Sequence, residues 1–342
     1  MAKVILAALL AMLLAILAGP KFIKFLRENE LGQHIREEGP PQHRVKQGTP
    51  TMGGLLFIIA AAIPFLVLSD YTLPGLAVFG VMLGCAAIGF ADDYTKLTRR
   101  RSLGLAGRWK LLLLVAITFF VGWAVNERDL ATEVYVPGID IEVDLWWVWY
   151  LLLFLIIAGA ANGANLTDGI DGLAVGVGII ALLTFTAMNV FTYIRSSQVA
   201  TEQDLAALDQ AILGASLIGG AIGFLWYNAF PAEVFMGDTG SMAIGGALGG
   251  FAIMGQSELL LILIGGIFVI EALSVILQVV SYKRWGRRIF LMTPIHHHFE
   301  MKAWSETKIM VRFWIMAAIL CGGAFALYYQ YLRGFRPDLF TS

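Results

Sequence analysis

Five short polar segments interrupt a chain that is otherwise strongly apolar. They carry aspartates, histidines, lysines and an asparagine, which are side chains suited to divalent cations and phosphate groups. Carboxylates and imidazoles are costly close to lipid, so a set of them at helix ends indicates a reaction site rather than chance. In chain order the segments are residues 46–54 (KQGTPTMGG), 91–96 (ADDYTK), 165–172 (NLTDGIDG), 237–241 (GDTGS) and 296–300 (HHHFE).

Asp92 and Asp93 stand where a long apolar run ends. Successive residues of an α-helix point about 100° apart, so one carboxylate could face a cation while the other faces a substrate. An acidic helix end explains these two residues equally well when they are taken alone. Lys96 follows one turn later and could bind phosphate as a point charge.

Asn165, Asp168 and Asp171 recur every third residue, which places all three on one side of a helix. Gly169 and Gly172, each directly after an aspartate, permit close approach of the backbone to a ligand or a neighbouring segment. An aspartate that caps the following helix would account for one carboxylate but not for the whole set. We therefore favour a functional role for this segment.

Asp238 comes directly before an apolar, glycine-rich run. A helix N-terminus with flexible glycines can bind an anion or a metal–phosphate group. The alternative is that Asp238 or Thr239 only caps the helix. The presence of the other four polar segments favours a functional role for Asp238.

His296, His297 and His298 suggest a zinc site at first sight. Three consecutive residues do not converge on one ion in a helix, however, and zinc sites use spaced ligands. Four basic residues lie just upstream, between positions 283 and 288. A loop that binds polyphosphate is the preferred interpretation, and a solvated basic loop is the alternative.

Glu271 is the one acid well inside a long apolar run. Such a residue could hold a proton or an ion, pair with a buried donor or line a polar groove, and the sequence does not choose among these roles. Gln278, two turns later, lies on nearly the same helix face.

Composition identifies the broad class of protein. Of 342 residues, 58% are hydrophobic and 14% are charged, and the mean hydropathy is +0.75. Soluble proteins contain about 25% charged residues, so the chain is expected to be integral to a membrane. The net charge of −1 gives no indication of nucleic-acid binding. Two cysteines inside apolar runs make a disulfide framework or a thiolate metal site implausible.

Ten apolar runs match the roughly 20 residues that a helix needs to cross a bilayer core. We therefore predict an all-α integral membrane protein with ten transmembrane helices in one polytopic domain, residues 1–342. The first run is read as a retained helix rather than a signal peptide, and the fourth can be extended by Lys110 snorkelling at its edge. The predicted spans are 4–20, 51–69, 71–91, 111–126, 145–167, 172–194, 210–232, 239–257, 259–282 and 313–332.

The basic residues predict the orientation. The first, third and ninth loops hold 18 of the 24 Lys and Arg residues, and the even-numbered loops hold only Arg128 and Arg195. Loops rich in Lys and Arg face the cytoplasm, so both termini are expected outside and all five polar segments on the cytoplasmic side. Residues 133–144 alternate around a Pro-Gly turn, which predicts a small periplasmic β-hairpin.

Taken together, the segments resemble the bacterial phospho-N-acetylmuramoyl-pentapeptide transferase family, part of the polyprenyl-phosphate N-acetylhexosamine-1-phosphate transferase superfamily. Asp-Asp-x-x-Lys at 92–96 and Gly-Asp-x-Gly at 237–240 are superfamily features, whereas 49–54 (TPTMGG) and 296–300 (HHHFE) look specific to the muramoyl-pentapeptide branch. The resemblance runs from Lys46 to Glu300 and agrees with the ten-span layout.

The resemblance implies transfer of phospho-MurNAc-pentapeptide from UDP-MurNAc-pentapeptide to undecaprenyl phosphate in the bacterial inner membrane. The products would be lipid I and UMP, in the first membrane step of peptidoglycan synthesis. The resemblance also implies a Mg²⁺ requirement and a homodimer.

The resemblance also assigns roles to individual residues. Asp238 would be the principal metal ligand, with Asp93 as a second candidate, and Asp92 would be a base on the lipid phosphate. Lys96 and the histidines 296–298 match the phosphate and sugar-peptide side, where either Arg108 or Lys110 could supply a second basic group. Positions that match the nucleoside pocket are Lys46, Thr51, Asn165, Asp168, Gly169, Asp171, Asn228, Phe235 and Gln278.

Two other functions compete with this one. A sister transferase that uses UDP-GlcNAc or a related sugar is the nearer rival, and the histidine segment argues against it. An ion-coupled transporter would place its acids near the bilayer midplane, whereas here only Glu271 is deep. We expect direct attack by the lipid phosphate rather than a covalent Asp92 intermediate, because a phosphate monoester is already largely ionised at neutral pH.

Overall fold

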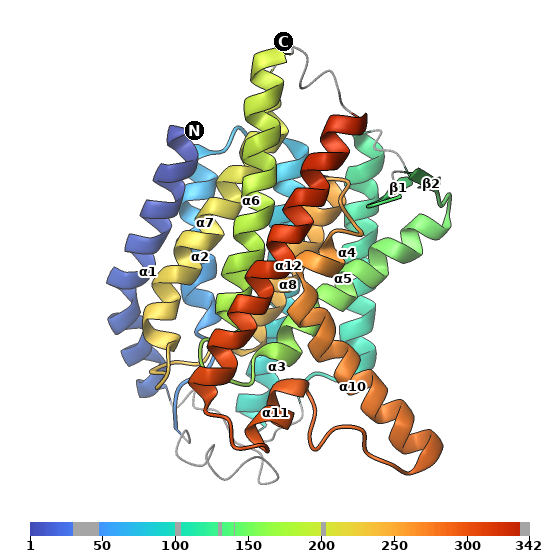
Figure 1. The fold of residues 1–342 in the computed structure, drawn as a ribbon. Helices are drawn as coiled ribbons and strands as arrows, with labels where there is room; N and C mark the ends of the chain where they lie inside the picture. The colour runs from blue at the N-terminus through green and yellow to red at the C-terminus, as the bar shows by residue number, and fades with distance from the viewer. Residues whose placement is uncertain (30–47, 100–103, 129–131, 140, 200–202, 336–342) are drawn as a thin grey trace.

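The computed structural model describes residues 1–29, 48–99, 104–128, 132–139, 141–199 and 203–335. Nearly all of the described chain is helical, and the helices pack side by side into one bundle (Figure 1). The elements are α1 (Ala2–Glu28), α2 (Gly54–Leu68), α3 (Leu73–Thr98), α4 (Gly107–Glu127), β1 (Glu133–Val136), β2 (Ile141–Asp144), α5 (Val148–Thr167), α6 (Leu173–Val199), α7 (Leu205–Asn228), α8 (Gly237–Met254), α9 (Leu261–Ile264), α10 (Gly266–Trp285), α11 (Ile295–Glu300) and α12 (Glu306–Phe335).

Eight helices in the described part of the chain are long and apolar enough to cross a membrane, namely α1, α3, α4, α5, α6, α7, α10 and α12. The prediction of a multi-pass membrane protein is thereby confirmed. Helix α2 has only 15 residues. Helix α8 has 18 residues, includes Asp238 and several glycines, and is not among these eight.

The predicted span 259–282 is not one continuous helix. It is broken at Gly265 into the single turn of α9 and the longer α10. Helix α10 then runs obliquely, and its far end projects from the bundle (Figure 1). Leu277, Val280 and Trp285 near that end are exposed.

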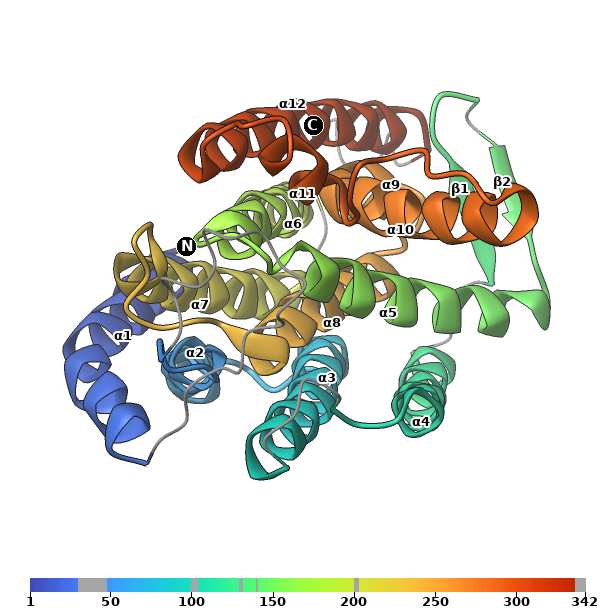
Figure 2. The same ribbon diagram turned by 90° about the horizontal axis from the view of Figure 1, so that it is seen from below.

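Helix α8 forms the centre of the bundle, with α2, α3, α5 and α6 packed against it (Figure 2). All its residues from Thr239 to Met254 are buried. Its glycines allow neighbouring helices to approach closely: a Cβ on Gly245 would lie 2.2 Å from the Ala160 carbonyl oxygen, and one on Gly246 would lie 2.7 Å from Cys85. Small residues are the usual means of close helix packing in membranes.

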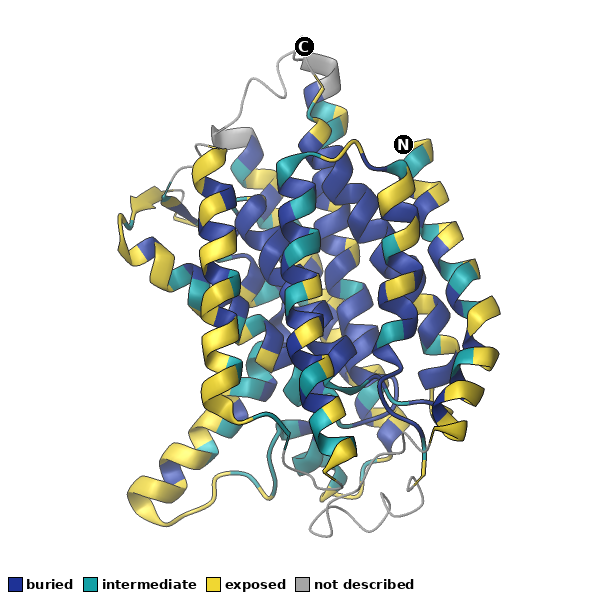
Figure 3. Cartoon of the chain, turned by 180° about the vertical axis from the view of Figure 1, so that it is seen from behind, coloured by how far each residue is buried: buried dark blue, intermediate teal, exposed yellow. Residues whose placement is uncertain are grey.

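Exposed side chains on the outer helices are largely apolar. Leu17 of α1 and Phe119 of α4 are 73% and 76% exposed. Figure 3 shows such exposed positions along the outside of the bundle and buried positions at its centre. This distribution is expected where lipid, rather than water, surrounds the helices.

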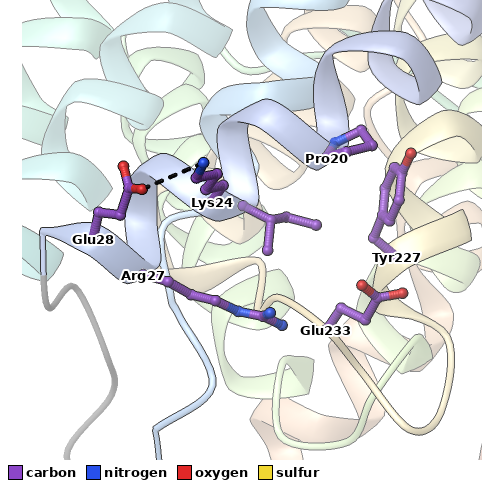
Figure 4. A pocket seen from close by; sticks show the side chains of 7 residues that line it. Pro20, Lys24, Arg27, Glu28, Tyr227 and Glu233 are labelled. Carbon is purple, nitrogen blue, oxygen red and sulfur yellow. Dashed lines mark ion pairs between the residues drawn. The ribbon is translucent and has the colours of Figure 1, made fainter.

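Helix α1 continues eight residues beyond the predicted span, through Pro20. Proline has no N–H to donate to the carbonyl four residues earlier, which here belongs to Ile16. The Tyr227 hydroxyl of α7 donates to that carbonyl instead, at 2.6 Å. Below this contact, a groove of about 380 Å³ opens between α1 and the end of α7 (Figure 4), lined by Pro20, Ile23, Lys24, Arg27, Glu28, Tyr227 and Glu233.

The end of the bundle that carries the N-terminus contains structural polar contacts. Strands β1 and β2 pair antiparallel, with Glu133 opposite Asp144, which confirms the predicted hairpin. The buried carboxylate of Asp209 on α7 accepts the backbone N–H groups of Asp70 and Thr72, both at 2.7 Å. Helix α11 lies at the opposite end of the bundle (Figure 1).

Candidate active site

Three carboxylates meet where α3 ends and α8 begins. Asp92 and Asp93 lie in the last two turns of α3, and Asp238 lies in the first turn of α8. One oxygen of each lies within 4.8 Å of the others. The backbones can approach so closely because Gly89 has no side chain: a Cβ there would lie 2.1 Å from the Asp238 carbonyl oxygen.

Two lysines bridge the carboxylates of Asp92 and Asp238. The Lys96 ammonium lies 2.7 Å from Asp92 and 3.0 Å from Asp238. The Lys110 ammonium lies 2.9 Å from Asp92 and 3.3 Å from Asp238. Lys110 therefore points into the acidic cluster, whereas Arg108 lies against the ring of the adjacent tryptophan.

Asp92 and Asp93 have different surroundings. Asp93 accepts the N–H of Asp238 at 3.1 Å, the N–H of Thr239 at 2.9 Å and the Thr239 hydroxyl at 2.7 Å. It thus caps the first turn of α8 from a neighbouring helix, where a carboxylate is favoured by the unpaired N–H groups. The α8 segment has no side-chain cap of its own, so the interpretation of Asp238 or Thr239 as the cap was wrong. Asp92 instead accepts the Leu105 N–H at 2.7 Å.

The 165–172 segment lies beside this cluster. The Asn165 amide donates to the Ser241 hydroxyl at 3.1 Å, and that hydroxyl donates to the Gly237 carbonyl at 3.0 Å. Burial, followed by the negative charges of Asp238 and Asp93, raises the pKa of Asp168 to about 8. A positive charge placed among these carboxylates would favour the ionised form of Asp168.

Asp171 and Asn228 join two loops. The Asp171 carboxylate accepts the Ala232 N–H at 3.0 Å. The Asn228 side chain accepts the Gly172 N–H at 3.1 Å and donates to the Val234 carbonyl at 2.9 Å. These contacts hold the segment after α5 against the segment before α8, so both residues shape the site through the backbone.

Thr51 and Phe235 lie at the next junction. The Phe235 N–H donates to the Pro50 carbonyl, and the Phe235 carbonyl accepts the Gly53 N–H, both at 2.8 Å. Thr51 is buried in this pairing. A Cβ on Gly237 would lie 2.9 Å from its hydroxyl, so Thr51 adjoins the start of α8.

The three histidines have three different environments. His296 is fully buried, and its Nδ1 lies 3.1 Å from Glu271 of α10. His297 contacts Glu300. His298 accepts the Leu291 N–H at 3.1 Å. A Cβ on Gly169 would lie 2.3 Å from His296 Nε2, so the structure places His296 beside the 165–172 segment.

Gln278, like Asp171 and Asn228, binds backbone groups through its side chain. Its amide oxygen accepts the N–H groups of Ile289 and Phe290, and its amide nitrogen donates to the Phe290 carbonyl. The side chain thus fixes the loop between α10 and α11, which leads to the histidines.

The acidic cluster fits a divalent cation. Hard cations such as Mg²⁺ are held by a few carboxylates, together with substrate phosphates and water. Asp238 has the most accessible side chain, 14% exposed against 2% and 3% for Asp92 and Asp93. Asp238 is therefore best placed to bind an ion together with a ligand.

Sequence reasoning missed two glycines that build this site. Gly89 permits the contact between α3 and α8. A Cβ on Gly104 would lie 2.3 Å from the Asp92 carboxylate, so the backbone of residue 104 packs directly over that acid. No pattern in one sequence separates these glycines from those that only aid packing.

Comparison with known proteins identifies the family. The model of glycosyl transferase family 4 matches residues 75–256. The first signature of phospho-N-acetylmuramoyl-pentapeptide-transferases matches residues 46–58, which include Lys46, itself outside the described residues.

Curated relatives span nearly the whole chain. A phospho-N-acetylmuramoyl-pentapeptide-transferase of Desulfitobacterium hafniense is 42% identical, covering 94% of this chain and 96% of its own. The Bacillus subtilis protein of that name is 41% identical, over 91% and 94%. That of Rubrobacter xylanophilus is 43% identical, over 97% and 99%. The family resemblance predicted from the motifs is confirmed, and the chain belongs to the phospho-N-acetylmuramoyl-pentapeptide transferases, which are membrane enzymes of glycosyl transferase family 4.

Proposed function

We propose that this enzyme transfers phospho-MurNAc-pentapeptide from UDP-MurNAc-pentapeptide to undecaprenyl phosphate, releasing UMP and forming lipid I. The observation that carries the proposal is the cluster of Asp92, Asp93 and Asp238 with Lys96 and Lys110. It lies at the ends of apolar helices, where a soluble nucleotide and a lipid phosphate can meet. Phosphoryl transfer depends on positioning and on neutralisation of charge, and this cluster supplies both.

Mg²⁺ is the proposed cofactor, with Asp238 as principal ligand and Asp93 as second candidate. The cation would supply charge neutralisation on the transferring phosphate. Asp93 fixes the first turn of α8 and so orients Asp238. The Lys96 and Lys110 ammonium groups, now shared by Asp92 and Asp238, are placed to contact incoming phosphate oxygens.

The nucleoside pocket is proposed at the neighbouring loops. Thr51, Asn165, Asp168, Gly169 and Phe235 lie at the junctions next to the start of α8 and are candidates for direct contact, together with Lys46. The side chains of Asp171, Asn228 and Gln278 form hydrogen bonds with backbone groups, so we assign these residues to shaping the pocket. The histidines 296–298 are proposed for the sugar-peptide side.

The proposed membrane arrangement has ten crossings, formed by the eight long apolar helices together with α2 and α8. Both termini would face outward, and the acidic cluster would face the cytoplasm of the inner membrane. The loops rich in Lys and Arg adjoin the polar segments of the sequence, and such loops face the cytoplasm. The enzyme is proposed to act as a homodimer. Cysteine labels at 284–288 should react only from the cytoplasmic side, and reaction from outside would refute this orientation.

The decisive experiment is UMP release by the purified protein. UDP-MurNAc-pentapeptide, undecaprenyl phosphate and Mg²⁺ should all be required, and UDP-GlcNAc should not substitute for the donor. Efficient turnover of UDP-GlcNAc would favour the sister transferase. Failure to release UMP from either donor would overturn the proposal.

A second experiment addresses the order of bond changes. In direct attack, a lipid phosphate oxygen forms the new P–O bond as the bond to UMP breaks, and no covalent enzyme accumulates. Asp92 is already engaged with Lys96, Lys110 and the Leu105 N–H, which supports a positioning role. Delipidated protein should then not exchange labelled UMP into the donor, whereas exchange that is lost in Asp92→Asn would establish a covalent route.

A further inference from the structure

Glu271 is a fully buried carboxylate in a helix long and apolar enough to span the membrane. A buried charge is costly unless it is paired. Its Oε1 lies 3.1 Å from Nδ1 of His296, a close contact that is not aligned as a hydrogen bond, and its Oε2 accepts the His296 backbone N–H at 3.4 Å. Ser274 donates to the Glu271 backbone carbonyl and not to the carboxylate. Both carboxylate oxygens therefore face one residue, 25 positions later in the chain.

The other side of the His296 ring faces the segment that carries Asp168 and Asp171. A Cβ on Gly169 would lie only 2.3 Å from His296 Nε2. Any larger residue at 169 would collide with the ring. His296 is fully buried, so its imidazole is held between Glu271 and the Gly169 backbone.

The Gly169 segment leads directly to the acidic cluster. Asn165, at the start of this segment, donates to the Ser241 hydroxyl, which donates to the Gly237 carbonyl at the start of α8. A shift of the His296 ring would therefore move the segment that we place at the nucleoside pocket.

We propose that Glu271 is a positioning residue that acts through His296, and that the pair holds the Asp168–Asp171 segment in the geometry that binds the nucleotide donor. A neighbouring carboxylate favours one orientation of an imidazole ring. The assignment rests on the proposed function. It gives the intramembrane acid a local role, in place of an ion path or a proton path.

The test measures donor binding and turnover separately. Glu271→Gln keeps the shape of the side chain but removes its charge. We expect the dissociation constant and the KM for UDP-MurNAc-pentapeptide to rise about 10-fold, which corresponds to about 1.4 kcal/mol. The KM for undecaprenyl phosphate should not change, and kcat should fall less than 3-fold.

A double-mutant cycle tests whether Glu271 acts through His296. In a His296→Asn background, Glu271→Gln should raise the donor dissociation constant no further. Gly169→Ala, which pushes on the ring from the opposite side, should reproduce the weaker binding even if Glu271→Gln does not fold. Gly159→Ala is its matched control, because a Cβ at residue 159 meets nothing within 4 Å.

Glu258→Gln is the control for loss of a buried acid. Glu258 is also buried but follows α8 at its other end, so donor binding should remain at the wild-type value. Additive effects of Glu271→Gln and His296→Asn would overturn the inference, as would a fall in kcat with donor binding unchanged. A wild-type protein that binds the donor but releases no UMP would refute the proposed function while leaving the binding test intact.

Discussion

Replacement of Gly89 by alanine tests whether the contact between α3 and α8 sets the geometry of the acidic cluster. The new Cβ would lie 2.1 Å from the Asp238 carbonyl oxygen, 2.4 Å from its carbonyl carbon and 2.7 Å from the Thr239 nitrogen. Cβ atoms essentially never approach other atoms closer than 3.0 Å. These neighbours are backbone atoms, so no side-chain rotation can relieve the collision.

The two helices must therefore separate by about 0.9 Å, the difference between 3.0 Å and 2.1 Å. The shift falls on Asp238 itself and moves it away from Asp92 and Asp93. A misplacement of about 1 Å can lower the rate of a reaction about 100-fold. Overpacking of a well-packed core costs about 1–3 kcal/mol, so the protein should still fold.

The assay is UMP release, measured with the melting temperature of the same sample. Gly89→Ala should lower kcat about 100-fold with a modest fall in melting temperature. Gly322→Ala on α12 is the matched control, since its Cβ would meet nothing within 4 Å, and it should match the wild type. A Gly89→Ala enzyme within 3-fold of wild-type kcat would refute the claim that this contact positions Asp238.

Five further substitutions separate the roles of the charged residues. Asp93→Asn should lower activity and should also lower stability by about 2 kcal/mol, because it weakens charge-assisted hydrogen bonds to the first turn of α8. Asp238→Asn should abolish UMP release with a normal melting temperature. Equal stability of the two variants would contradict the capping role of Asp93. Lys110→Met should lower kcat/KM about 100-fold and Arg108→Met less than 3-fold, and the reverse order would show that the wrong base was assigned. Asp209→Asn at the opposite end of the bundle should lower stability by about 1–2 kcal/mol with kcat unchanged, and a large loss of turnover would contradict its purely structural role.

The sequence alone predicted the membrane class, because hydropathy and span length are local properties of the chain. It also located the 133–144 hairpin, whose turn residues and alternation lie within one short segment. The polar motifs pointed to the transferase family, and the relatives confirm it. The sequence predicted the exact ends of the helices less well. Helix α1 passes through Pro20 because Tyr227, far away in the chain, satisfies the Ile16 carbonyl.

Only the tertiary structure decided which polar groups touch. Asp93 caps α8 across 146 positions of sequence, and the choice of Lys110 over Arg108 depends on where α4 starts relative to α3. The pairing of Glu271 with His296 likewise follows from the turn between α10 and α11. Each contact depends on the separation and rotation of two helices. Separation and rotation depend on how closely neighbouring segments can pack at positions such as Gly89 and Gly169. A periodic pattern along one helix does not predict them.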